Sequence, residues 1–182
     1  MNKLTLFAII LVSQVCFGQK ANRVITKQGQ ITFFSYTSVE DIEASNNQVL
    51  SIVDLSSKEV AISMLMRTFV FRKALMQEHF NESYIESDVY PKATFEGEIQ
   101  DFDISLPPLQ TKLVKGKITI HGVTKEVEIK AQIEYVNNVL VLSGNLNLTV
   151  ADFKIKIPPI VAGNIAKTIQ VKFRFEYQPY EN

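Results

Sequence analysis

Cysteine is nearly absent from this 182-residue chain, and its one example, Cys16, lies close to the N-terminus. A single thiol cannot form an internal disulfide, so no cysteine framework stabilises the fold. If residues 1–18 are removed as a signal peptide, the remaining chain has no thiolate nucleophile and no thiolate metal ligand. Its stability must then come from packing, for which a 46% hydrophobic chain of this length can supply one core.

Histidine is also scarce, and His79 and His121 are far apart, with no carboxylate at zinc-binding spacing from either. The chain lacks the G-x-S-x-G elbow of a serine hydrolase and a glycine-rich turn that could cradle a phosphate. Glu96 and Glu98 suggest a glycosidase carboxylate pair, but their alternation with apolar residues is typical of the wet face of a strand. These absences predict a protein that is not an enzyme and needs no metal or cofactor.

Neither sign of charge is in excess, because 19 lysines and arginines balance 19 aspartates and glutamates. The chain as a whole therefore produces no field that would draw it to nucleic acid or to an anionic membrane surface. We expect no nucleic-acid partner. The sequence is compatible with a homodimer.

Long hydrophobic runs are missing except near the N-terminus, where Lys3 precedes an apolar stretch over residues 4–12. This stretch is about half of the roughly 20 residues that a transmembrane helix needs. Residues 1–18 instead have the pattern of a secretory signal peptide. A lipoprotein signal acylated at Cys16 is the alternative, which is disfavoured because no small residue directly precedes that cysteine. We expect one domain over residues 19–182, exported to the periplasm or the extracellular space.

Beyond the leader, apolar and polar residues alternate with the period of two that is typical of β-strands, and no long window has helical periodicity. In residues 168–177, Phe173 and Phe175 share one face, while Lys172 and Arg174 share the other. Eight segments have this character. The expected strands cover residues 30–36, 48–55, 59–66, 92–104, 111–120, 128–135, 140–150 and 168–177.

The segments between these strands predict turns and one helix. Asn46-Asn47 and Asn137-Asn138 are typical of tight turns, and a change of apolar face between Ile99 and Phe102 indicates a bulge. Residues 71–80 have apolar pairs at i,i+4 spacing and predict a short helix that closes one end of a barrel or covers an edge. An all-β fold follows, but the pattern alone leaves a barrel and a sandwich open.

Two stretches resemble the YceI-like family. In the first, Glu78-His79-Phe80 is followed by a Tyr90-Pro91 turn and a strand that reaches Phe95; the second is the hairpin Gly116-Lys117-Ile118-Thr119-Ile120-His121-Gly122-Val123-Thr124-Lys125. The resemblance spans residues 30–177. It implies an elongated, antiparallel, lipocalin-like barrel of about eight strands that holds a polyisoprenoid chain. His121 would then have an architectural role at a turn.

Apolar side chains on the inner strand faces are the candidates for contact with such a ligand. From the pattern alone they are ordinary core, and Val49 and Val53 belong to the same inward-facing set. The resemblance instead implies that they line a lipid cavity. The expected lining residues are Phe33, Met64, Met66, Phe71, Phe80, Phe95, Leu146, Leu148, Phe173 and Phe175.

Two functions follow from these alternatives. The first is an exported protein that sequesters or transports a long apolar lipid, such as a polyisoprenoid or an isoprenoid quinone. The second is a structural or interaction protein with a solid barrel, whose function lies on its surface or on two loops that are unusually apolar, residues 106–109 and 157–161. The apolar character of these two loops favours either a partner or a cavity lid.

Overall fold

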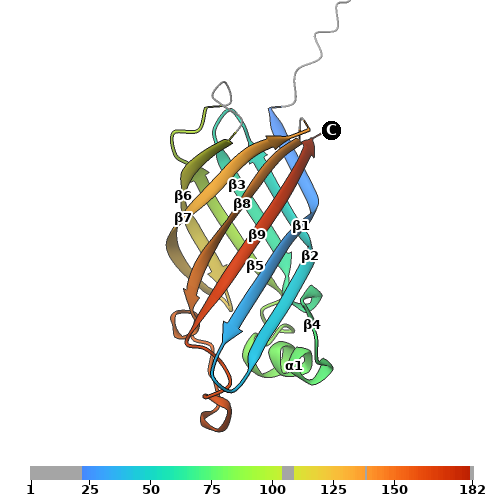
Figure 1. Cartoon of the computed structure of the whole chain (residues 1–182), viewed down its shortest axis with the longest axis vertical. Coiled ribbons are helices and arrows are strands. Elements are labelled where there is room, and N and C mark those ends of the chain that lie inside the picture. The colour runs from blue at the N-terminus through green and yellow to red at the C-terminus, as the bar shows by residue number, and fades with distance from the viewer. Residues whose placement is uncertain (1–21, 104–108, 138, 181–182) are drawn as a thin grey trace, which may run out of the picture.

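The computed structural model describes residues 22–103, 109–137 and 139–180. The expected signal peptide, Asn138 and the Pro107-Pro108 loop lie outside the described residues. Within them, strands dominate the structure and helices are few and short (Figure 1).

The strands form one antiparallel sheet that closes into a barrel. Its order is β1-β9-β8-β7-β6-β5-β3-β2, and β1 pairs with β2 to complete the ring. A two-residue strand, β4, pairs with the outer part of β2. The expected antiparallel barrel of about eight strands is confirmed. The strands are β1 (Arg23–Tyr36), β2 (Asp41–Asp54), β3 (Glu59–Leu65), β4 (Val70–Phe71), β5 (Lys92–Ile99), β6 (Leu109–Ile120), β7 (Val123–Val136), β8 (Val139–Thr149) and β9 (Thr168–Pro179).

The alternation in the sequence determines which side chains face the interior. In β7, Ile129, Ala131 and Ile133 are buried, whereas Lys130 and Gln132 between them are exposed. Successive side chains of a strand point to opposite faces, so the apolar set of every strand faces the barrel axis.

The expected turn at Asn46-Asn47 is wrong, because both residues lie inside β2. The side chain of Asn46 is fully buried, and its Nδ2 donates to the backbone oxygen of Leu65 at 3.1 Å. The hairpin that joins β1 to β2 instead turns at Thr37, whose backbone N–H donates to the oxygen of Glu40. A long-range hydrogen bond that the local sequence does not reveal therefore keeps a turn-forming residue in a strand.

Other boundaries differ more modestly. The strand expected over residues 92–104 ends at Ile99, and a turn with Asp101 at φ 52° takes the place of the expected bulge before Phe102. At the β7–β8 hairpin, Asn137 has φ 51°, as a tight turn requires.

The helical segment lies between β3 and β5, at one end of the barrel (Figure 1). A one-turn 3₁₀ helix, η1 (Met66–Thr68), leads into β4, and α1 (Ala74–His79) continues into a π-helical turn, η2 (Phe80–Tyr84). The short helix is confirmed, but it begins later than expected. Phe71 belongs to β4 and pairs with Ala44 of β2, so this residue lies in a strand before the helix begins.

Candidate functional site

The barrel interior is hollow in the half nearer to α1, which is the lower half in Figure 1. A cavity of about 440 Å³ opens at the end where α1, the β1–β2 turn and the β8–β9 connection lie, and this opening is called the mouth. All eight long strands contribute to its wall. Examples, one from each strand in chain order, are Ile31, Ile42, Ile62, Phe95, Ile118, Ile129, Leu146 and Phe173.

The upper half of the barrel is filled by side chains and forms a closed end. Its core residues are buried but do not line the cavity. They include Val24, Val53, Ile99, Phe102, Ile133, Leu140 and Tyr177. The expected alternative of a solid barrel therefore holds for the closed end only, and it is wrong for the mouth half.

Glycines allow large rings to lie against the cavity wall. Gly97 pairs directly with Gly116, and a Cβ added to either would lie 2.6 or 2.7 Å from Cζ of Phe95. Gly29 has the same relation to Phe175, whose Cδ1 would be 2.4 Å from an added Cβ. These rings lie flat on the wall because the strands beneath them lack side chains, which leaves the centre of the lower barrel open.

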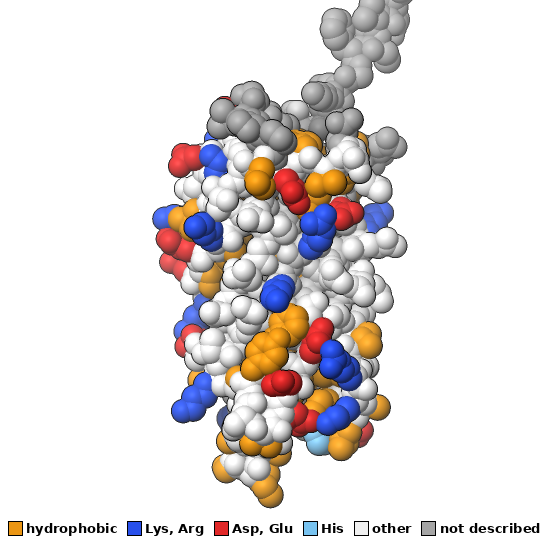
Figure 2. Space-filling view, in the orientation of Figure 1, with side chains coloured by type: hydrophobic (Ala, Val, Ile, Leu, Met, Phe, Trp, Pro, Cys, Tyr) orange, Lys and Arg blue, Asp and Glu red, His pale blue; other side chains and the backbone are white. Residues whose placement is uncertain are grey.

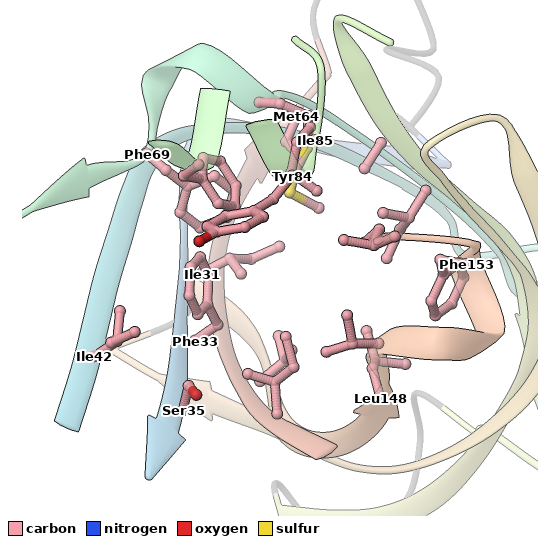
Figure 3. Close-up of a pocket in the computed structure, with 18 of the residues that line it drawn as sticks. Ile31, Phe33, Ser35, Ile42, Met64, Phe69, Tyr84, Ile85, Leu148 and Phe153 are labelled. Carbon is pink, nitrogen blue, oxygen red and sulfur yellow. The ribbon is translucent and has the colours of Figure 1, made fainter. Parts of the chain in front are cut away.

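Four aromatic rings join the helical segment to the barrel at one side of the mouth. The Phe33 ring centroid lies 5.3 Å from that of Phe69, 5.7 Å from Phe71 and 5.6 Å from Phe80. Phe71 and Phe80 are themselves 5.0 Å apart. Such contacts favour a fixed position of the helix. Figure 3 shows Phe33, Phe69 and Tyr84 on one side of the cavity and Phe153 on the other.

Polar groups are confined to the mouth. Six lining residues carry one, namely Ser35, Glu40, Lys73, His79, Tyr84 and Asn164. The Lys73 ammonium lies 2.6 Å from a Glu40 carboxylate oxygen, and this hydrogen bond lowers the pKa of Glu40 more than burial raises it. Ser35 Oγ accepts from the backbone N–H of Ala166 at 2.8 Å. The depth of the cavity is therefore dry, and its entrance is polar and charged.

His121 holds a second part of the rim in place. Its Nε2 lies 2.9 Å from Glu86 Oε2, and its Nδ1 lies 3.1 Å from the backbone oxygen of Phe153, a lining residue. The ring also packs against Tyr90, with centroids 4.3 Å apart. His121 and Gly122 both have positive φ in the β6–β7 turn, so the histidine has the architectural position expected from the sequence.

The structure brings the ten expected lining residues together, since each of them borders the cavity. Val49 and Val53 face inward as well, but they are packed in the closed end. Whether a ligand contacts the ten residues remains a prediction.

Several lining residues were not expected from the sequence. They come from the segments between strands and are Phe69, Leu75, Met76, Tyr84, Ile85, Phe153, Ile155 and Ile165. One signal was available, because Ile155 and Ile157 alternate with Lys154 and Lys156, which indicates a segment with one apolar face. Ile157 and Val161 line the cavity, so this loop has the position of a lid.

Neither a candidate metal site nor a candidate membrane-spanning helix occurs in residues 22–103, 109–137 and 139–180. No group of three or more histidine, cysteine, aspartate or glutamate side chains is arranged to hold a metal ion. No helix among them has the length and hydropathy to cross a membrane.

The fold and the site together define a closed antiparallel β-barrel with an apolar cavity that opens at one end. The YceI-like domain model matches residues 13–177. The chain belongs to the YceI-like family. No curated protein matches its sequence closely enough to count as a relative.

Solved structures with a similar fold include the following three. A polyisoprenoid-binding domain from Saccharophagus degradans, described as implicated in plant cell wall breakdown, has a TM-score of 0.74 at 12% identity, over 88% of this chain and 100% of that one. BcnA of Burkholderia cenocepacia has a TM-score of 0.68 at 16% identity, over 82% and 96%. The Campylobacter jejuni YCEI protein has a TM-score of 0.54 at 16% identity, over 74% and 81%. At these identities the likeness concerns the fold.

Proposed function

We propose that this protein holds the hydrocarbon chain of a long apolar lipid, of the polyisoprenoid or isoprenoid-quinone type, in its barrel cavity. The observation that carries the proposal is the distribution of polarity: the depth of the cavity is apolar, and every polar lining group lies at the mouth. A lipid with a long tail and a small polar head has the same distribution. The polyisoprenoid-binding description of the Saccharophagus degradans domain, which has this fold, supports the assignment.

The energetics are adequate for binding without a polar anchor. Each buried methylene contributes roughly 0.8 kcal/mol, so about ten of them give on the order of 8 kcal/mol before the cost of ordering the chain. Before that cost is subtracted, this free energy corresponds to about micromolar affinity. A volume of about 440 Å³ lies within the range of roughly 300–1,000 Å³ that is typical of small-molecule pockets.

The polar head of such a lipid would lie beside Glu40, Lys73 and Asn164. Lys73 is 68% exposed and Glu40 is 23% exposed, so both can exchange hydrogen bonds with a head group at the rim. The hydrocarbon tail would run inward between Phe33 and Leu146 toward Phe173.

The protein would act in sequestration or transport rather than in catalysis. The signal-peptide pattern of residues 1–18 supports export, to the periplasm or the extracellular space. A carrier requires an apolar cavity for the hydrocarbon chain, which fits the apolar side chains that line the depth of the barrel.

Native mass spectrometry of the protein, purified from cells that produce the whole chain, tests this proposal. We expect a stoichiometric adduct whose organic extract contains an isoprenoid or quinone-like lipid. Leu146→Trp, which adds bulk inside the cavity, should remove the adduct, whereas Leu109→Trp makes a comparable change at an exposed position on the closed end. An empty protein that also ignores added isoprenoid alcohols would overturn the proposal and favour an interaction protein.

A further inference from the structure

The β8–β9 connection, residues 150–167, extends beyond the strands at the mouth and forms the lower tip of the molecule (Figure 1). It contains two 3₁₀ turns, η3 (Val150–Phe153) and η4 (Pro159–Val161). Its outermost part is apolar, and Ile160 is 91% exposed, the highest value among the large exposed hydrophobic residues. Figure 2 shows hydrophobic side chains gathered at this tip. Exposure of an aliphatic side chain to water is unfavourable, and its burial would be favourable.

The connection that forms this tip also carries basic side chains. Lys154, Lys156 and Lys167 are exposed, and the connection contains one acidic residue, Asp152, so its formal charge is +2. None of the three lysines has an ion-pair partner within residues 22–103, 109–137 and 139–180. The chain as a whole is neutral, but screening limits surface electrostatics to about 10 Å, so this local charge governs any contact made by the tip.

Two neighbouring segments expose apolar side chains at the same end. Val39 in the β1–β2 turn is 65% exposed, and Leu75 in α1 is 60% exposed while also lining the cavity. Glu40 and Glu43 of this region are paired with Lys73 and Arg72. Glu78 and Glu82 of the helical segment are exposed and have no ion-pair partner among the described residues, so the excess of basic side chains belongs to the β8–β9 connection. The exposed apolar surface therefore continues from the tip to the rim of the cavity.

We infer that the mouth of the barrel docks on an anionic lipid bilayer, with Ile160 entering the boundary between head groups and acyl chains. Lys154, Lys156 and Lys167 would contact lipid phosphates. Aliphatic residues next to lysines are typical of surfaces that bind membranes, whereas lysine is depleted in protein–protein interfaces. The composition of the tip therefore favours a bilayer over a protein as the partner.

This inference rests on the proposed function, because docking would place the cavity entrance against the source of its ligand. Ile157 and Val161 line the cavity on the inner side of the segment whose outer side carries the exposed tip. A lipid could then pass from the bilayer into the barrel beside the apolar side chains of Ile157 and Val161. It would not have to cross water, which is the costly step for a long hydrocarbon chain.

Vesicle flotation of residues 19–182, the chain expected after removal of the signal peptide, tests the inference. The probes are vesicles of phosphatidylcholine alone and of an equal mixture with phosphatidylglycerol, both free of isoprenoids. We expect the protein to float with the mixed vesicles and to bind them less at high salt. Ile160→Glu should weaken this partitioning by about tenfold, and each lysine-to-glutamine change at positions 154, 156 and 167 by about fivefold.

Leu109→Glu is the matched control, because Leu109 is 59% exposed at the closed end. This change should leave flotation unaltered. The inference is overturned if the wild-type protein does not float, if Ile160→Glu and Leu109→Glu float equally, or if the tip is instead found to capture a protein partner. Retention of isoprenoid by the cavity, measured without vesicles, separates the two ideas: flotation can fail while the protein still binds lipid, and an empty barrel can still float.

Discussion

The hydroxyl groups of Ser51 and Tyr177 lie 2.7 Å apart in the closed end of the barrel and share a hydrogen bond. Both residues are almost completely buried, and neither lines the cavity. Burial of Tyr177 raises the pKa of its phenol far above the usual value, and only the hydrogen bond with Ser51 opposes this effect. This polar pair links β2 and β9 across the barrel interior, although both strands pair with β1 and not with each other.

We expect Ser51→Ala or Tyr177→Phe to reduce the free energy of unfolding by about 1–3 kcal/mol. Ser51→Ala leaves the buried Tyr177 hydroxyl without a hydrogen-bond partner, and Tyr177→Phe does the same to the Ser51 hydroxyl. The double variant should lose less than the sum of the two changes. Urea denaturation of the four proteins measures this coupling. Strictly additive losses would show that the hydrogen bond contributes nothing to stability, and lipid binding should remain unchanged throughout.

Leucines on the inner face of β8 offer a comparison between the two halves of the barrel. Leu140 is 5% exposed within the closed end, whereas Leu146 lines the cavity and is only half-buried. Leu140→Ala should cost about 2–5 kcal/mol of stability because it opens a void in packed surroundings. Leu146→Ala should cost less than about 2 kcal/mol, since one side of this residue already lacks packing partners. Equal losses in thermal denaturation would contradict a hollow lower half.

The same two leucines show how far the sequence predicts the site. Alternation identifies both as inward-facing, because side-chain direction repeats every two residues. It does not reveal depth along the barrel axis, so Val53 in the closed end and Phe173 in the cavity wall look alike. That difference depends on which chains meet across the interior, and those contacts are far apart in sequence.

Residues outside the strands were harder to predict for a related reason. Phe69 and Phe153 have no periodic pattern around them, and the fold brings them to the cavity through the ring cluster and the bond from His121. The resemblance to a family predicted the barrel, but not the side chains that its connections contribute. Asn46 illustrates the opposite error, since a strong local turn signal is overridden by its bond to Leu65.

Gly29 provides a test of the ring arrangement at the floor of the cavity. Gly29→Ala would place a Cβ 2.4 Å from the ring of Phe175, which is fully buried and cannot move freely. We expect Gly29→Ala to lower the free energy of unfolding by about 1–3 kcal/mol. Adding Phe175→Leu to the same chain should restore part of this stability. The control is Gly163→Ala, because nothing lies within 4 Å of the added atom. Urea midpoints for the variants measure these effects; a neutral Gly29→Ala would contradict the tight contact.

The carboxylate of Asp54 organises the β2–β3 turn at the closed end. Its Oδ1 accepts from Ser56 Oγ at 2.5 Å and from the backbone N–H groups of Ser56 and Ser57, while its Oδ2 accepts from Arg23 Nε at 2.9 Å. The bond from the Ser56 hydroxyl is the largest of several contributions that hold the pKa of Asp54 well below its usual value. The folded state therefore favours the ionised carboxylate.

A lowered folded-state pKa means that Asp54 contributes stability above its unfolded pKa of about 4 and loses this contribution as the pH falls toward the folded value. Asp54→Asn should reduce stability by about 1 kcal/mol at neutral pH, because the amide cannot accept all of these bonds. The gap between wild type and variant should narrow below about pH 4. Urea midpoints from pH 7 down to pH 2.5 measure it, and a constant gap would show that ionisation of Asp54 does not stabilise the turn.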